Sequence, residues 1–481
     1  MHTHRRLVVV LSPLVAAGLV LAVPATSTGR SPGARSGSAH GWVTVSGKNV
    51  DSSLTVPSIA RFGHAYEVVW QARTGAATEA IQGRRLTSSG KTSGGVVTVV
   101  GAWPSLRGDP TILGYAGQHL VAFAGAQNSG PYTTGAEFYT TSASGTVWTL
   151  STGSLSAANG ADQDTGNAVT NDGGTLIAGM AEANGVRYHA GISASNPAPG
   201  TDPLTSTTGN SSYTPGLGLD RSTSRVWALW FSNDGAGGHD GVWAQPVRPA
   251  LGSLIHAPGS SAKGGTTARG VAQDLSAASR VGGGVYTAYV TPASRSVDVW
   301  KVGAAKPLAT LKDLKGPSNV TVTAAPKGRI WVFWRDNDGW RATRSNRTAT
   351  RFGAVVKLRP PSGMQVGFGV AGDGSRGPLE AVGMVATSSG QTRVVAQRVR
   401  PHLSVHRSPK SVKPGGSFTV TVTDAGDAVI GAHVHFAGKT YKTGRKGSVK
   451  IKIARSTGRG KRAVTVTATG YAKATVTVKV S

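Results

Sequence analysis

The sequence predicts an all-β protein, a seven-bladed β-propeller followed by a small β-sandwich. A short apolar strand that ends in a bulky residue recurs seven times between residues 42 and 401, about every 50 residues. No stretch in that range keeps apolar residues at the spacing of a helix face over a dozen positions. The last eighty residues instead alternate apolar and polar residues with the period of two that is typical of strands.

The N-terminus predicts export. Two arginines precede an apolar run from Leu7 to Val23, and small residues around Ala25 suit a signal peptidase. We expect residues 1–25 to be a secretory signal peptide, with no transmembrane segment left after its cleavage; a retained membrane anchor is the alternative. Residues 26–41 are rich in Ser, Gly, Pro and Arg and predict a flexible leader.

The composition excludes several classes of protein. The chain has 481 residues and no cysteine, which rules out disulfides, a thiolate nucleophile, a Cys-ligated zinc and an iron–sulfur cluster. It carries 51 Lys and Arg residues against 22 Asp and Glu, a formal net charge of +29. No pattern in the sequence predicts a cofactor. The run from Asp336 to Gly339 starts like a calcium loop but lacks the downstream glutamate, so we expect no metal.

The repeat between residues 42 and 401 has the length of a four-stranded propeller blade. A first strand precedes each recurring strand, a third follows it, and a weaker fourth can be read in most units; in the third unit it lies near residues 203–206. The recurring strands end at Trp70, Phe123, Met180, Trp230, Tyr289, Trp334 and Met384.

The seventh unit ends at Val399 without a fourth strand. Trp42–Ser46 precedes the first complete unit and has no other place, so we predict that it pairs with Arg393–Val399 and closes the ring. Closure would leave no bare sheet edge. The alternatives are a ring of six or eight blades, an open stack of sheets, or two β-sandwiches.

Residues 402–481 form a separate predicted domain. The stretch KPGGSFTVTVTDAGDAVIGAHVHFAGKTYKTGRKGSVKIKI and the later Gly470-Tyr471 resemble the bacterial Ig-like and carboxypeptidase-regulatory-like (prealbumin-like) domains over about 75 residues. Arg445 and Lys446 stand where those families often place Asp in a turn. The resemblance implies a spacer or binding appendage and no catalysis.

In repeat length and aromatic strands, residues 42–401 resemble the secreted sialidase-like and lectin-like propellers. The Asp-box turn of that group is degenerate here, at Ser232–Gly235 and at Asp336–Trp340. A fold shared by lectins, hydrolases, lyases and scaffolds does not fix a function.

The positive charge predicts an anionic partner. Residues 402–481 hold 15 Lys and Arg residues against two acids, a net charge of +13. We expect this domain to bind an anionic cell-wall or cell-surface polymer, for example a polysaccharide, and no specific nucleic acid. The alternative is that these charges only solvate the domain. The residues expected to bind the polyanion are Lys450, Lys452, Arg455, Arg459, Lys461 and Arg462.

The loops predicted on one rim of the ring could hold a ligand. A glycoside hydrolase needs two carboxylates about 5–10 Å apart, whereas most loop Asp residues make turns through hydrogen bonds to the backbone. The ligand-binding rim is expected at Arg107, Asp162, Asp240, Arg269, Arg335 and Asp338. The carboxylates of a hydrolase would come from Asp109, Asp164, Asp234 and Asp336.

These features predict a secreted, monomeric and non-catalytic binding or adhesion protein, whose propeller mouth contacts a ligand. The alternative is an extracellular glycoside hydrolase or other polysaccharide-degrading enzyme.

Overall fold

A computed structural model describes residues 41–481 except 52–55, 76–77, 127–135, 151–162, 173–174, 183–184, 193–211, 233–239, 262–274, 292–294 and 313. Its regular elements are strands, apart from the single 3-10 turn η1 (Pro326–Gly328). None of these residues forms a helix long and apolar enough to cross a membrane. The predicted signal peptide and nearly all of the predicted leader lie outside the described residues.

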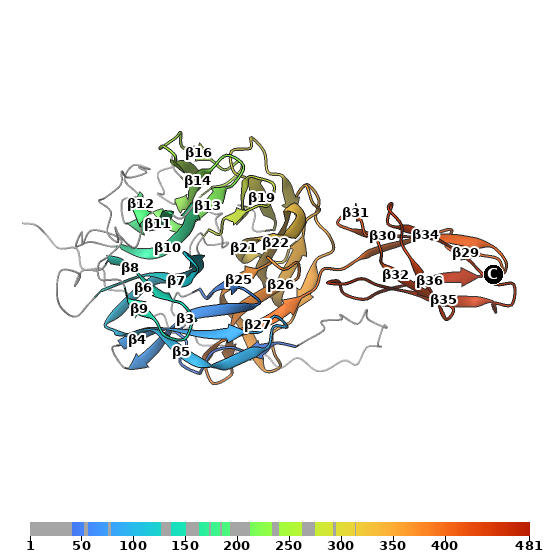
Figure 1. Ribbon diagram of the computed structural model, residues 1–481, viewed down its shortest axis with the longest axis horizontal. Coiled ribbons are helices and arrows are strands. Elements are labelled where there is room, and N and C mark those ends of the chain that lie inside the picture. The colour runs from blue at the N-terminus through green and yellow to red at the C-terminus, as the bar shows by residue number, and fades with distance from the viewer. Residues whose placement is uncertain are drawn as a thin grey trace, which may run out of the picture. The chain divides into compact units, whose positions relative to one another are not determined.

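Seven small antiparallel sheets follow one another in the described part of residues 43–399 (Figure 1). Sheet 1 holds β2 (Ser58–Phe62), β3 (Ala65–Gly75), β4 (Thr78–Leu86) and β5 (Thr92–Trp103). Sheet 2 holds β6 (Ser105–Tyr115), β7 (Gln118–Ala126), β8 (Ala136–Ser142) and β9 (Thr149–Leu150). Sheet 3 holds β10 (Gln163–Asp172), β11 (Thr175–Glu182) and β12 (Gly185–Ile192).

The remaining sheets repeat the same order of strands. Sheet 4 holds β13 (Ser212–Asp220), β14 (Arg225–Ser232), β15 (Gly241–Arg248) and β16 (Ile255–His256). Sheet 5 holds β17 (Ala278–Ser279), β18 (Val285–Val290), β19 (Val297–Lys301) and β20 (Ala309–Leu311). Sheet 6 holds β21 (Ser318–Ala325), β22 (Arg329–Asp336), β23 (Gly339–Arg344) and β24 (Val356–Leu358). Sheet 7 holds β25 (Met364–Asp373), β26 (Leu379–Thr387), β27 (Thr392–Val399) and the N-terminal β1 (Val43–Thr44).

The sheets form a closed ring. The first strand of each sheet lies beside the first strand of the next, and β25 of sheet 7 lies beside β2 of sheet 1. One apolar cluster joins sheets 7 and 1, where Trp70 packs with Val382 and Met384. Val43 pairs with Ala396 and Thr44 with Val395, so the predicted pairing of Trp42–Ser46 with Arg393–Val399 is confirmed. The arrangement is that of a β-propeller.

The second strand of each sheet supplies the core because it is covered on both faces by neighbouring sheets. Six of the seven predicted closing residues, from Trp70 to Met384, are at most 2% exposed. Met180, the seventh, has a side chain outside the described set. The predicted fourth strand of the third unit, near residues 203–206, also lies outside the described residues.

Residues 402–481 form a β-sandwich of two sheets around one core. The first sheet contains β28 (Ser404–Ser408), β30 (Ser417–Asp424), β31 (Asp427–Ala428) and β34 (Ser448–Lys452). The second contains β29 (Ser411–Val412), β36 (Ala474–Val480), β35 (Gly460–Thr467), β32 (His433–Phe436) and β33 (Lys439–Lys442). Phe418 and Ile451 from the first sheet pack with Val464 from the second, as the period of two predicts.

Candidate functional sites

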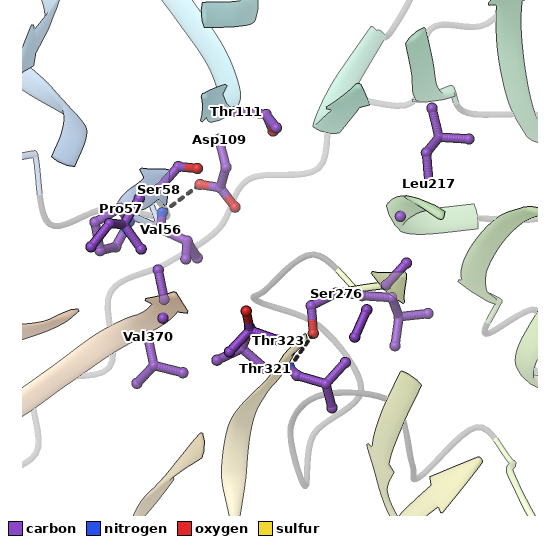
Figure 2. Close-up of a pocket in the computed structure, with 18 of the residues that line it drawn as sticks. Val56, Pro57, Ser58, Asp109, Thr111, Leu217, Ser276, Thr321, Thr323 and Val370 are labelled. Atoms are coloured by element: carbon purple, nitrogen blue, oxygen red, sulfur yellow. Dashed lines mark hydrogen bonds between the residues drawn. The ribbon is translucent and has the colours of Figure 1, made fainter. Parts of the chain in front are cut away.

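The first strands of the sheets surround a central channel, which holds a cavity of about 390 Å³. Figure 2 shows Ser58, Asp109, Leu217, Thr321 and Val370 around this space, each from a different sheet. Five of the first strands have a register shift near their start: β6, β10, β13, β21 and β25. Bulges at these points bend each strand where the channel begins.

Hydrogen bonds to side-chain hydroxyl groups connect neighbouring sheets around the channel. The backbone N–H of Ile112 donates to Ser58 Oγ (3.2 Å), which joins sheets 2 and 1. The N–H of Val322 donates to Ser276 Oγ (2.6 Å), and that of Gly374 to Thr323 Oγ1 (3.3 Å). Gly216 is required in this wall, since a Cβ there would lie 1.9 Å from the carbonyl oxygen of Leu275.

Asp109 is the acidic residue in the described wall of the channel. The sequence analysis placed it in a loop; it lies instead inside β6, at the bulge, because the strand begins four residues earlier. Its carboxylate accepts a hydrogen bond from the Val56 N–H, and only 8% of the residue is exposed. Burial raises the pKa of Asp109 to about 8, so the carboxyl is mostly protonated at neutral pH.

The structure does not gather the four carboxylates of the hydrolase hypothesis in the channel. Asp336 ends β22 and forms a buried ion pair with Arg341 (3.1 Å to Nε), away from the channel wall. Asp164 lies in β10, but its side chain is outside the described set, and Asp234 lies outside it altogether. None of the described residues that line the channel is aromatic, so the described part of the wall offers no ring on which a sugar could stack.

The described residues of the predicted ligand-binding rim come from sheets 2, 4 and 6. The guanidinium of Arg335 lies 5.1 Å from the ring of the exposed Phe368, and burial lowers the pKa of Arg335. Asp338 forms an ion pair with Arg341, whose hydrogen bond lowers the pKa of that carboxyl. The backbone oxygen of Asp240 hydrogen-bonds to His256 Nε2 (3.0 Å). Arg107 lies at the bulge of β6, and Asp162 and Arg269 fall outside the described residues.

The predicted polyanion-binding residues do come together. The β34–β35 connection meets residues 409–416 and the C-terminus at one end of the sandwich, through backbone hydrogen bonds such as Gly415 N to Ile453 O (3.1 Å) and Ser481 N to Val412 O (3.1 Å). Three exposed lysines that the sequence analysis did not name join them there. We call this set the basic end: Lys410, Lys413, Lys450, Lys452, Arg455, Arg459, Lys461, Arg462 and Lys479.

The two acids of the domain lie at its other end, against sheet 6. Asp424 is 1% exposed and forms ion pairs with Arg344 and with Arg329 (3.0 Å). The hydroxyl of Tyr471 also donates to Asp424 (3.0 Å), and Asp427 pairs with Arg329 (2.6 Å). Both carboxylates are therefore engaged at the contact with β22 and β23.

The sequence analysis missed a second kind of site, in which a buried glutamate lies between two sheets. Glu67 of β3 contacts His119 of β7 in the next sheet. Glu380 of β26 pairs with Arg398 of its own sheet and lies beside Gly90 of sheet 1. Burial raises the pKa of Glu380 to about 7. A charged residue inside an otherwise apolar second strand was the signal available in the sequence, although it does not name the partner.

No protein-family model and no curated protein matches the chain. Among solved structures, a protein of unknown function from Dyadobacter fermentans is similar with a TM-score of 0.44 at 10% identity, covering 74% of this chain and 97% of its own. Aleuria aurantia lectin has a TM-score of 0.38 at 8% identity, covering 84% and 97%. A GH43 endo-arabinanase from Bacillus licheniformis has a TM-score of 0.31 at 11% identity, covering 73% and 94%. The assignment of the fold rests on the strand pairing and not on these distant similarities.

Proposed function

We propose that the chain is an extracellular binding protein that holds an anionic cell-wall or cell-surface polymer through the basic end of its C-terminal domain. In this proposal the ring is a seven-bladed propeller closed by β1, and residues 402–481 are an Ig-like sandwich. The observation that supports it is the distribution of charge: both acids of the sandwich are engaged at its contact with sheet 6, and nine of its 15 Lys and Arg residues gather at the other end.

The basic end is unfavourable for folding by itself. Lys461 stands directly opposite Lys479 on neighbouring strands, and like charges in such a pair destabilise a sheet. A polyanion relieves that repulsion, and each contact releases condensed counterions, so the affinity falls steeply with salt. Screening over about 8–10 Å means that neighbouring charges must act together, as they do here.

The test replaces Arg455, Arg459, Lys461 and Arg462 with Glu. The matched control replaces four exposed cations near the Asp424 end, Lys442, Arg445, Lys446 and Lys473, so both variants have the same net charge. Binding to heparin and to teichoic acid is measured between 50 and 300 mM salt. We expect about a hundredfold loss for the first variant and less than about threefold for the control. An equal loss in both variants would show that net charge alone decides binding.

The hydrolase alternative is tested on the same preparation. Reducing ends released from plant and bacterial polysaccharides are measured for the wild type and for Asp109→Asn, which removes the one acid in the described channel wall. The binding function predicts no release in either protein. Release that disappears in Asp109→Asn would instead support the enzyme.

A further inference from the structure

A second hollow lies between sheets 1 and 2, at the C-terminal ends of their first strands, β2 and β6. It measures about 540 Å³ and lies between the β2–β3 turn and the β6–β7 turn, with Arg85 of β4 on its wall. We call it the Arg85 hollow; its wall includes Arg61, Phe62, Arg85, Tyr115, Gln118 and His119.

His119 is fixed in this wall with one ring nitrogen engaged. Its Nδ1 contacts the Glu67 carboxylate, and the side chains of these two residues are 8% and 3% exposed. The ring of Phe62 stacks on the imidazole at a centroid distance of 3.5 Å and an angle of 6°. Since Nδ1 donates to Glu67, Nε2 is the nitrogen left for a ligand.

A tight turn at Gly145 packs against the Glu67–His119 pair. Gly145 adopts a φ of 75°, and a Cβ there would lie 2.5 Å from Glu67 Oε2 and 3.0 Å from His119 Nδ1. Only glycine allows this turn to sit on the glutamate and the imidazole. The packing holds the imidazole in one orientation. Glu67 is not part of the wall of the hollow; it lines a neighbouring cavity of about 200 Å³, which Arg85 also borders.

The described wall of the Arg85 hollow carries two exposed arginines and no carboxylate. Arg85 stands opposite Glu67 across β4 and β3, but its guanidinium forms no hydrogen bond or ion pair with the described residues. A guanidinium presents a planar set of donors that matches a carboxylate, sulfate or phosphate group. Asp373 of sheet 7 accepts a hydrogen bond from the Arg61 backbone and interacts with the Arg61 charge, but it is not part of the wall of the hollow.

We infer that the Arg85 hollow binds a compact anionic group, a carboxylate, sulfate or phosphate, either as a free small anion or as a substituent on a sugar. Arg61 and Arg85 supply the opposite charge. His119 lies in the same wall, where its ring is held in place by Glu67 and Phe62. This site is on the ring and separate from the basic end, so each can fail without the other.

The test uses the full chain carrying the Glu substitutions at the basic end, so that phosphate has one cationic surface fewer to occupy. Inorganic phosphate, methyl β-glucuronide and the uncharged methyl β-glucoside are titrated by calorimetry. We expect phosphate and the glucuronide to bind and the glucoside not to bind. Tighter binding of phosphate indicates a free anion, and tighter binding of the glucuronide indicates a charged sugar.

Arg85→Gln should weaken binding of the preferred anion by about tenfold or more. The matched control is Arg225→Gln, an exposed arginine at the corresponding hairpin of sheet 4, which should change the affinity by less than about twofold. His119→Gln is the second variant, with tryptophan fluorescence as the check on folding. Unchanged affinity in Arg85→Gln, or equal binding of the glucoside and the glucuronide, would overturn the inference.

Discussion

Buried carboxylates connect neighbouring parts of this basic protein. Asp109 accepts a hydrogen bond from Val56, two residues before β2. Glu67 contacts His119 of the next sheet, and Asp424 contacts Arg344 of sheet 6. Each of these acids is at most 8% exposed. Taking a carboxylate out of water is costly unless a partner compensates or the group becomes neutral. Glu67 and Asp424 have a partner that can carry positive charge. Burial keeps Asp109 mostly in its neutral form.

Asp109 should make the stability of the ring depend on pH. Its pKa is about 8 in the folded chain, against 3.8 for an ordinary aspartate, so the native state keeps a proton that the unfolded state has lost. The free energy of unfolding should therefore fall by about 1.4 kcal/mol per pH unit between pH 4 and pH 8. Asp109→Asn mimics the protonated carboxyl and should remove this contribution, leaving that of Glu380, whose pKa of about 7 acts in the same direction.

The measurement is denaturant unfolding at pH 5 and pH 8, followed by tryptophan fluorescence. Asp338→Asn is the control, since Arg341 lowers the pKa of that exposed carboxyl and its titration lies below pH 4. A slope that persists unchanged in Asp109→Asn would show that another group titrates in this range.

At the scale of the strand, the sequence predicts which strands are buried on both faces. The second strands read as continuous apolar runs with an aromatic or other bulky end, and the structure places each of those described in the core. The first strands were harder to predict, because no sequence pattern marks the bulges that insert extra residues into them. Residues 262–274 of the fifth unit lie outside the described residues. The described first strand of that unit is the short β17 (Ala278–Ser279), which pairs with β18 across the turn at Gly282–Gly284.

The closing strand β1 should be needed for a stable ring. Val45 follows β1 and is fully buried between sheets 7 and 1, and the Val394 N–H donates to Ser46 Oγ (2.8 Å). A chain that starts at Gly41 should keep these contacts, whereas one that starts at Lys48 should lose them and expose the edge of β27. We expect a loss of about 3 kcal/mol or more in the free energy of unfolding, with concentration-dependent aggregation. Equal unfolding midpoints for the two truncations would contradict closure by β1.

The candidate sites differ in how far they could be predicted. The charge distribution along the sequence identifies most of the basic end, because several of its residues are close in sequence: Arg455, Arg459, Lys461 and Arg462. Glu67 and His119 are 52 residues apart and meet only because sheets 1 and 2 pack side by side. Lys410 and Lys479 likewise join the basic end through the parallel pairing of β29 with β36. One sequence holds no signal for such contacts beyond a charge in an apolar strand.

At the scale of the whole molecule, Asp424 should couple the sandwich to the ring. It is buried with Arg329 and Arg344, so Asp424→Ala would leave two buried guanidinium groups short of a partner. Removing one member of a buried ion pair typically costs about 3–5 kcal/mol. All 11 tryptophans precede residue 402, so tryptophan fluorescence reports on the ring alone.

We therefore expect Asp424→Ala to lower the denaturant midpoint of the tryptophan transition, although the substitution is in the other domain. Asp424→Ala combined with Arg344→Met should recover part of the loss, since the double variant no longer leaves the Arg344 charge buried without its acid. Thr421→Ala, on the half-exposed face of the same strand, serves as the control and should leave the tryptophan midpoint unchanged. If the sandwich unfolds earlier in Asp424→Ala while the tryptophan midpoint does not move, the two domains are energetically independent. The buried ion pairs would then stabilise the sandwich alone.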